Sequence, residues 1–415
     1  MEVIQAIRGT KDILPEEVVY WQYVERVAAE ILEKAAYREI RTPIFESTHL
    51  FERGIGETTD VVGKEMYTFI DKGNRSITLR PEGTAGVVRA YIQNKLYASG
   101  GVERLWYCGA MFRYERPQAG RQRQFHQIGL ELIGSNSPRA DVEVIVLATE
   151  ILRKLGLENL SLQLNSVGSV EDRQKYREAL VDYLTPYRED LDKDSQERLT
   201  RNPLRILDSK DSKTQEIVKG APSILDYLGA ESRRHFDTVC SLLTDLGIAY
   251  QLNPHLVRGL DYYTHTAFEI QSADLGAQAT VCGGGRYDGL VSQLGGNETP
   301  AVGWAMGMER LILLLQNIRP MSPPCVDIYF ASRGEKAERQ ALIVAQNLRR
   351  AGFRVELDLS GSNFAKQLKR ASRSGAKKCL ILGDEEVENN TIQLKDLTTG
   401  QQETISQSQL IDFLR

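Results

Sequence analysis

A proline-rich break near residue 320 constrains the fold of this chain more than any other sequence feature. Pro320, Pro323 and Pro324 fall within residues 318–324, and proline fits neither a helix interior nor a central strand. Beyond the break, strand-like runs at 326–330, 354–357 and 379–382 alternate with helical patterns at 335–351 and 363–374. This alternation predicts a small α/β domain with a parallel sheet. We therefore predict two domains, at residues 1–320 and 325–415.

The first domain contains a predicted hairpin with a long polar loop. Strand-like runs at 105–114 and 125–133 flank residues 115–124, which are rich in Arg, Gly and Pro. Long loops between good strands are often functional. Helical patterns follow Pro15 at 18–36 and recur at 84–96 and from 308. From 171 to 247 strand formers become rare and charges crowd together, which predicts a helical insertion.

Composition excludes several classes of protein. The chain is 41% hydrophobic and 26% charged, as expected of a globular protein that does not enter a membrane. No signal pattern opens the sequence, so we expect a cytoplasmic location. The net charge of −4 argues against a protein that binds nucleic acid over most of its surface. It does not exclude a local basic surface. The five cysteines include no C-x-x-C pair and no ligand spacing with histidine, so we predict no disulfide framework and no metal held by side chains.

Polar residues on the second hairpin strand form the first candidate site. Alternate strand residues share a face, so Gln127, Gly129 and Glu131 lie opposite Ile128 and Leu130. A carboxylate on a mostly apolar strand must be solvated or paired. The pattern fits either the solvent face of an edge strand or the polar wall of a binding site.

Arginines gather at the hairpin loop. Arg113 ends the first strand, and Arg116, Arg121 and Arg123 follow in the loop with Glu115. Guanidinium groups bind phosphate through two parallel hydrogen bonds and stay charged. The loop therefore suits a polyphosphate, and a solvated charged loop is the alternative.

Two further segments could line the same site. Arg258 precedes Tyr262 and Tyr263 at the start of a strand-like run. The alternative is a turn followed by two tyrosines that only pack in the core, which is the commoner reason for adjacent tyrosines. Between Gly303 and Arg310, glycines allow close approach to a flat ligand, and Arg310 lies near a helix start. The glycine-rich runs match no nucleotide-binding fingerprint.

Seven segments, taken in their order along the chain, resemble segments of class II aminoacyl-tRNA synthetases. The resemblance is closer still to the histidyl-tRNA synthetase family. Residues 41–46 are similar to class motif 1, 112–117 with 125–127 to motif 2, and 307–310 to motif 3. The most specific segment is 256–264, LVRGLDYYT, which is similar to a signature peculiar to the histidine enzymes. Residues 7–15 and 79–84 extend the resemblance, which covers nearly the entire chain.

The resemblance implies an α+β fold with an antiparallel sheet flanked by helices. Residues 325–415 would then be the anticodon-binding domain, and the insertion would touch the acceptor stem. The implied activity joins L-histidine to ATP as histidyl-adenylate, with release of pyrophosphate, and then transfers histidine to the 3′ end of tRNA(His). A homodimer, formed through motif 1, and Mg²⁺ bound with ATP are also implied.

The resemblance also implies roles for the arginines. Arg113 is expected to hold the α-phosphate and the histidine carboxylate. Arg258 is expected to contact the α-phosphate from the other side, where other class II enzymes use a metal. Glu115, Arg121 and Arg310 are expected to bind ATP.

The expected histidine site takes in residues from several segments. Glu82, Thr84 and Gln127 are expected to bind the ammonium group, and Glu131 and Tyr263 to recognise the imidazole. Gly83 is included in the site, and Tyr262 is expected to close it. On the tRNA side, the expected contacts are Arg116 and Gln118 in the motif 2 loop.

Elementary chemistry agrees with these roles. An anionic carboxylate must attack an anionic phosphate, and two arginines on opposite sides offset that repulsion. No covalent nucleophile is needed. A buried carboxylate is a good acceptor for a ring N–H, which predicts selectivity without an editing domain.

A basic stripe in the last domain suits RNA phosphates, with a solvated helix face as the alternative. The stripe comprises Lys366, Lys369, Arg370, Arg373 and Lys377. Two other functions remain open. One is a regulatory paralogue that keeps the fold but does not aminoacylate, and the other is a nucleotide-sensing or RNA-binding module without catalysis.

Overall fold

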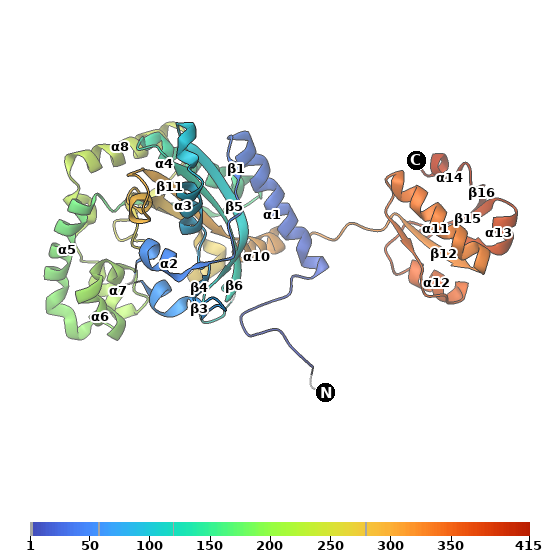
Figure 1. The fold of residues 1–415 in the computed structure, drawn as a ribbon, viewed down its shortest axis with the longest axis horizontal. Helices are drawn as coiled ribbons and strands as arrows, with labels where there is room; N and C mark the ends of the chain where they lie inside the picture. Colours follow the sequence, from blue (N-terminus) through green and yellow to red (C-terminus); the bar gives the residue numbers. More distant parts are fainter. Residues whose placement is uncertain (1–2, 57–58, 119, 279) are drawn as a thin grey trace. The chain divides into compact units, whose positions relative to one another are not determined.

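The computed structural model describes residues 3–56, 59–118, 120–278 and 280–415 and divides into two compact units, Met1–Met321 and Ser322–Arg415 (Figure 1). The first unit is built on an eight-stranded sheet with the order β1-β5-β6-β11-β10-β9-β7-β8. Its strands are β1 (Arg38–Glu39), β5 (Glu103–Phe112), β6 (Gln124–Ile133), β7 (Leu160–Ser166), β8 (Gln251–Leu252), β9 (Thr264–Ser272), β10 (Thr280–Arg286) and β11 (Ala301–Gly307).

The inner strands of this sheet pair antiparallel, and only the short β1 and β8 pair parallel with their neighbours. The predicted antiparallel sheet is therefore confirmed. The predicted hairpin is confirmed as well, since β5 and β6 pair from Phe112–Gln124 to Glu103–Ile133. Strand β6 lies between β5 and β11, so it is not an edge strand.

One face of the sheet is covered by four helices. They are α1 (Pro15–Lys34), α4 (Pro138–Lys154), α8 (Ala230–Asp245) and α10 (Met308–Ile318). Their apolar residues share a core with Ile128 and Leu130 of β6, Trp304 of β11 and Phe268 of β9. Alternation along β6 therefore sends Gln127 and Glu131 to the other face, as the sequence predicted.

The other face carries α2 (Thr48–Ile55), α3 (Thr84–Gln93) and α9 (Leu290–Gln293), with a smaller core that includes Tyr107, Tyr262 and Tyr287. Helix α3 ends before the predicted residue 96 because Lys95 has a positive φ of 52°. A 3₁₀ turn, η2 (Leu96–Ser99), follows it.

A three-stranded antiparallel sheet lies beside α2. It consists of β2 (Phe45–Ser47), β4 (Ser76–Leu79) and β3 (Tyr67–Ile70), in that spatial order. A π-helical turn, η1 (Val61–Glu65), precedes β3.

Helical elements form the insertion, which lies across the first unit from α1 (Figure 1). They have a core of their own, including Tyr176, Leu180 and Ile206, that continues into Val257 and Ala267 outside the insertion. The elements are α5 (Val170–Leu184), η3 (Thr185–Asp190), α6 (Lys193–Arg201), η4 (Pro203–Asp208), α7 (Ser212–Val218) and η5 (Ile224–Tyr227). A further 3₁₀ segment, η6 (Ala273–Gln278), joins β9 to β10.

The second unit is a five-stranded sheet with the order β13-β12-β14-β15-β16. The predicted parallel pairing is confirmed for β12, β13 and β14, while β15 and β16 add an antiparallel hairpin that the sequence pattern did not reveal. The elements are β12 (Ile328–Arg333), α11 (Glu335–Arg350), β13 (Val355–Leu357), α12 (Phe364–Ala371), β14 (Lys378–Gly383), α13 (Asp384–Glu388), β15 (Thr391–Asp396), β16 (Gln402–Ser406) and α14 (Leu410–Leu414).

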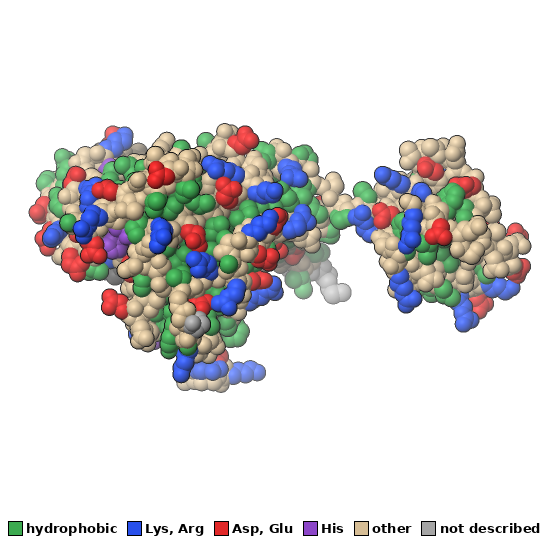
Figure 2. Space-filling view, turned by 90° about the horizontal axis from the view of Figure 1, so that it is seen from above, with side chains coloured by type: hydrophobic (Ala, Val, Ile, Leu, Met, Phe, Trp, Pro, Cys, Tyr) green, Lys and Arg blue, Asp and Glu red, His purple; other side chains and the backbone are tan. Residues whose placement is uncertain are grey.

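Charge is mixed on the surface that Figure 2 shows, where acidic and basic side chains are interspersed over both units. In the predicted basic stripe, Arg370 is bound to Asp358, with Nε 2.8 Å from a carboxylate oxygen, and Arg373 and Lys377 lie beyond the end of α12. Within the described residues, no helix is long and apolar enough to cross a membrane.

Candidate active site

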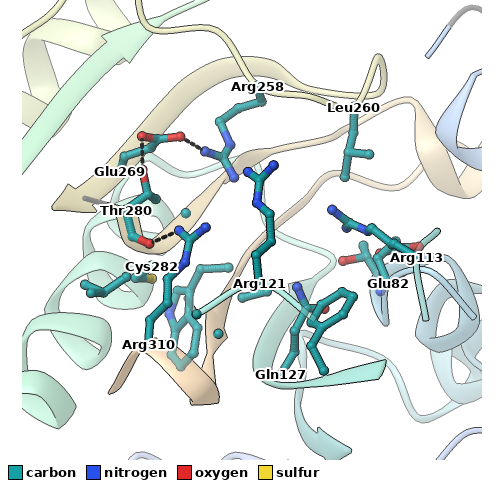
Figure 3. A pocket seen from close by; sticks show the side chains of 18 of the residues that line it. Glu82, Arg113, Arg121, Gln127, Arg258, Leu260, Glu269, Thr280, Cys282 and Arg310 are labelled. Atoms are coloured by element: carbon teal, nitrogen blue, oxygen red, sulfur yellow. Dashed lines mark hydrogen bonds and ion pairs between the residues drawn. The ribbon is translucent and has the colours of Figure 1, made fainter. Parts of the chain in front are cut away.

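A cavity of about 450 Å³ opens over the sheet face opposite α1 and α4. It is lined from β5, β6, β9, β10 and β11, the starts of α3 and α10, the hairpin loop, residues 258–263 and the insertion loop after η4. Ten of the fourteen site residues implied by the resemblance lie in its lining: Glu82, Thr84, Arg113, Glu115, Arg121, Gln127, Arg258, Tyr262, Tyr263 and Arg310. Segments more than 200 positions apart in the sequence thus meet at one site (Figure 3).

Arg113 lies on one wall of this cavity. Its Nε donates to the carbonyl oxygen of Pro81 at 2.8 Å, and its guanidinium carbon lies 5.4 Å from the ring centroid of Phe125. Glu115 is its nearest acidic partner, at 3.8 Å from Nη1. These contacts hold the guanidinium in place while leaving N–H groups for a ligand.

Arg258 lies on another wall of the same cavity, with Arg121 between it and Arg113 in the view of Figure 3. Its guanidinium is ion-paired with Glu269 and lies flat against Gly283, where a Cβ would come within 2.6 Å of the guanidinium carbon. Burial opposes the charge, but the Glu269 carboxylate raises the pKa of Arg258 above its ordinary value. Arg258 is therefore a permanent, partly desolvated cation in the site. Its Nε has no hydrogen-bond partner among the described residues.

Arg121 and Arg310 complete the cationic lining. Arg121 is ion-paired with Glu115 at 2.9 Å, and Arg310 donates to the carbonyl oxygen of Thr280. Burial and the nearby charge of Arg121 lower the pKa of Arg310. An anion bound between these arginines would relieve that repulsion.

Glu82 and Thr84 form the N-terminal end of α3. The Glu82 carboxylate accepts the backbone N–H groups of Thr84 at 2.6 Å and Ala85 at 2.9 Å. Burial raises the pKa of Glu82 despite these hydrogen bonds. A cationic group would therefore be stabilised beside it. Gly83 lies outside the lining, against the ring of Tyr107.

Glu131 lies just behind the cavity and is 1% exposed. Its Oε1 accepts the hydroxyls of Thr84 at 2.7 Å and Tyr107 at 3.4 Å, and its Oε2 accepts the hydroxyl of Tyr287. A carboxylate has about four lone-pair sites, so one remains on Oε2. A side chain on the cavity-lining Gly303 would collide with that oxygen, so the glycine keeps Oε2 within reach of the cavity.

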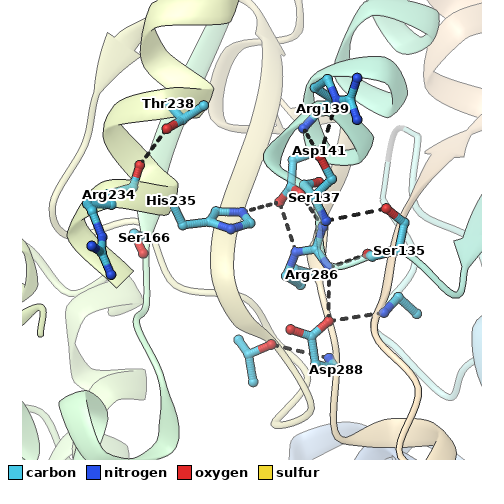
Figure 4. A network of polar contacts seen from close by, with 12 residues as sticks. Ser135, Ser137, Arg139, Asp141, Ser166, Arg234, His235, Thr238, Arg286 and Asp288 are labelled. Atoms are coloured by element: carbon cyan, nitrogen blue, oxygen red, sulfur yellow. Dashed lines mark hydrogen bonds and ion pairs between the residues drawn. The ribbon is translucent and has the colours of Figure 1, made fainter. Parts of the chain in front are cut away.

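A buried ion pair fixes the backbone next to Tyr287. Arg286 and Asp141 are 1% and 0% exposed and pair directly, and Arg286 also donates to the carbonyl of Ser135 at 2.8 Å (Figure 4). Burial opposes ionisation of Asp141, yet hydrogen bonding from His235 and the charge of Arg286 lower its pKa to about 2. This network anchors the end of β10, from which Tyr287 reaches Glu131.

Two predicted tRNA contacts lie outside the cavity. Arg116 and Gln118 are exposed on the hairpin loop, and Gln118 closes a turn with Arg121 through backbone hydrogen bonds of 3.0 and 2.9 Å. Among the described residues, no group of three or more His, Cys, Asp or Glu side chains is placed to hold a metal ion.

Sequence reasoning missed several residues of the site, notably Tyr107, Glu269, Thr280 and Tyr287. Glu269 had a usable signal, because it is a carboxylate on the apolar run 267–270, the same pattern that singled out Glu131. The two tyrosines could be placed only with the strand register, which puts Tyr107 opposite Gly129.

Comparisons with known proteins agree with this geometry. Residues 9–311 match the family described as histidyl-tRNA synthetase, and residues 325–415 match the anticodon binding domain. The chain is 72% identical over 412 residues to a protein named histidine–tRNA ligase from Rippkaea orientalis, covering 99% of this chain and 96% of the relative. The structure of apo histidyl-tRNA synthetase from S. aureus has 41% identity and a TM-score of 0.82, and the match covers 99% of this chain and 100% of that one.

A more distant structure shows the fold alone. It is described as an ATP phosphoribosyltransferase regulatory subunit/histidyl-tRNA synthetase from Bacillus halodurans, with 22% identity and a TM-score of 0.66, over 89% of this chain and 97% of that one. The family match, by contrast, spans most of the first unit, and the close relatives are matched over almost their whole length. The chain therefore belongs to the histidyl-tRNA synthetase family.

Proposed function

We propose that this protein is a histidine–tRNA ligase. It activates L-histidine with ATP, forming histidyl-adenylate and pyrophosphate, and then transfers histidine to the 3′ end of tRNA(His). The observation that carries this proposal is the shared cavity of Arg113 and Arg258, bordered by Glu82 and Tyr263.

In the first step, a carboxylate oxygen of histidine attacks the α-phosphorus of ATP, and the bond to the β-phosphate breaks with its electron pair leaving on pyrophosphate. Arg113 and Arg258 hold the α-phosphate from two sides and stabilise the charge that grows there. Arg121 and Arg310 bind the other phosphates, with Glu115 also at the nucleotide. A guanidinium group binds phosphate best through two parallel hydrogen bonds, which suits Arg121 and Arg310 to this role.

ATP would bring Mg²⁺ into the site. The cavity lining fits such an ion, because the carboxylates of Glu115 and Glu269 lie in it. The ion would neutralise phosphate charge.

Histidine is bound by its two polar ends. Glu82, Thr84 and Gln127 bind the ammonium group, a role supported by the buried, unpartnered Oε1 of Gln127. The ring N–H of histidine donates to the free lone pair of Glu131, whose carboxylate also accepts the three hydroxyls described above. Tyr263 lies on the other side of the ring. Tyr262 closes the pocket.

In the second step, the terminal hydroxyl oxygen of the tRNA attacks the carbonyl carbon of the adenylate. The bond from that carbon to the phosphate oxygen breaks, AMP leaves with the electron pair, and the hydroxyl proton is released to water. We propose that Arg116 and Gln118 meet the acceptor end, which their exposure on the hairpin loop supports. The second unit would bind the anticodon, as its match to an anticodon binding domain suggests. Because tRNA and ATP are its substrates, we expect the protein to work in the cytoplasm.

A homodimer is supported by an apolar surface on the small sheet. Phe45 and Phe69 lie on one face of β2-β4-β3 and are 56% and 48% exposed. Exposed apolar patches of this kind mark interfaces. Light scattering should give a mass of about twice that of one chain, and a single-chain mass would contradict the proposal.

Pyrophosphate exchange tests the proposed function. The wild-type protein should move labelled pyrophosphate into ATP in the presence of histidine and without tRNA. Omitting histidine, or replacing it with another amino acid, should abolish the signal. A regulatory paralogue or a non-catalytic binding module would show no exchange, and that result would end the proposal.

A further inference from the structure

The helical insertion is fastened to the rest of the first unit beside the cavity. Arg173 of α5 donates to the carbonyl of Tyr263 at 2.6 Å, and Arg198 of α6 pairs with Asp60 at 2.9 Å. The side-chain amide of Asn202 donates to Asp261 at 3.0 Å. The insertion therefore forms a fixed part of the wall near the residues that precede β9.

The short loop between η4 and α7 is held rigidly on this wall. Ser209 is 7% exposed, and its hydroxyl donates to Asp192 at 2.8 Å. Asp192 also accepts the hydroxyl of Thr214 at 3.0 Å, and Asp211 caps α7 by accepting the N–H of Thr214 at 2.9 Å. Burial opposes the charge of Asp192, but the hydroxyl and backbone N–H of Ser195 on α6, with the hydroxyls of Ser209 and Thr214, lower its pKa to about 2. The backbone is thus anchored on both sides of residue 210.

Lys210 is carried by this loop into the active site. It lines the 450 Å³ cavity together with Arg113 and Arg258, and it also lines an adjoining cavity of about 540 Å³ that shares both arginines. Within the part of the chain that the structure describes, Lys210 makes no hydrogen bond or ion pair, and its neighbour Asp208 is paired with Arg205 at 3.7 Å.

Three arginines that line the same cavity differ from Lys210 in this respect, because each faces a carboxylate. Arg113 and Arg121 both face Glu115, and Arg258 is paired with Glu269. Lys210 can therefore take up an anion without giving up such a pair. An ammonium group on a flexible stem binds phosphate as a point charge and does not require one fixed orientation.

We propose that Lys210 is a phosphate-binding residue of the active site, supplied by the insertion. Its ligand is a phosphate group of a substrate that spans the two cavities, either in the triphosphate of ATP or at the 3′ end of the tRNA. This inference rests on the proposed function and adds a residue that the family motifs in the sequence did not indicate.

The test compares Lys210→Ala with wild type in two reactions. The first is histidine-dependent pyrophosphate exchange without tRNA, measured against ATP concentration. The second is transfer of histidine from preformed adenylate to tRNA(His), measured in a single turnover. Lys213→Ala is the matched control, because Lys213 is an exposed lysine of the same insertion that pairs with Asp190 at 2.7 Å.

Loss of one charge-assisted contact should change one of these reactions by about tenfold, or about 1.4 kcal/mol. A raised KM for ATP with unchanged KM for histidine assigns Lys210 to the triphosphate. A slower transfer with normal exchange assigns it to the tRNA end. Lys210→Arg should restore most of the loss, and Lys213→Ala should leave both reactions unchanged.

Two results would overturn the inference. One is wild-type behaviour of Lys210→Ala in both reactions, and the other is an equal loss in Lys213→Ala. Either result leaves the proposed function standing, since wild-type exchange is measured in the same experiment. Absence of exchange in the wild type would instead refute the proposed function itself.

Discussion

Replacing Arg258 with alanine is expected to slow formation of histidyl-adenylate by about 100- to 1,000-fold, the usual effect of removing one preorganised donor from a transition state. The guanidinium lies flat on Gly283 and is held by Glu269. It is therefore in place before charge grows on the α-phosphate. Affinity for histidine should change much less. Single-turnover adenylation and equilibrium binding of histidine measure the two effects separately.

Two variants control this experiment. Arg258→Lys keeps the charge but loses the two-pronged donor, so it should recover only part of the rate. Arg153→Ala removes an exposed arginine that is paired with Glu150 on α4, and it should behave as wild type. Equal losses of adenylation and histidine binding in Arg258→Ala would mean that the residue binds the ground state or only supports the fold.

The second large effect is expected for Glu131→Gln. Above pH 8, where Glu131 is ionised, a neutral acceptor in its place weakens the hydrogen bond from the imidazole, so kcat/KM for histidine should fall by about 100-fold. Discrimination against amino acids without a ring N–H should fall with it. Pyrophosphate exchange with histidine and with near analogues measures both quantities. Unchanged affinity for histidine would refute the imidazole assignment.

The same variant should be more stable than the wild type at high pH. Burial raises the pKa of Glu131 from 4.5 to about 8, so between these values the folded protein binds the proton more tightly than the unfolded chain does. The contribution of Glu131 to stability therefore falls as pH rises from 4.5 to 8. Glu131→Gln removes this dependence.

Denaturation at several pH values tests this expectation. The difference between Glu131→Gln and wild type should be small near pH 4 and grow to about 4 kcal/mol at pH 8. Glu150→Gln, at a 52% exposed carboxylate of α4, serves as the control. A constant difference across this pH range would mean that Glu131 does not titrate as proposed.

Local patterns were sufficient for most of the fold. Pro15 starts α1 because proline suits the first helical turn, and alternation along β6 put Ile128 and Leu130 in the core. Periodicity could not give strand direction, because alternate residues share a face in parallel and antiparallel sheets alike. Periodicity also did not indicate the hairpin formed by β15 and β16.

The candidate site was predictable where a segment carried its own signal. The arginines of the hairpin loop and Glu131 on an apolar strand were of this kind. Tyr287 and Lys210 could not be predicted, because the sequence around each gives no signal of a site. Their place in the site depends on contacts with segments far away in the sequence. Tyr287 depends on a register across β10 and β11, and Lys210 on the packing of the insertion.

The central claim is that two guanidinium groups from distant parts of the chain act on one phosphate. A crystal structure with a stable analogue of histidyl-adenylate tests it most directly. Nitrogen atoms of both Arg113 and Arg258 should lie within hydrogen-bonding distance of the α-phosphate oxygens, with the imidazole directed at Glu131. A bound analogue whose phosphate touches only one of these arginines would contradict the claim.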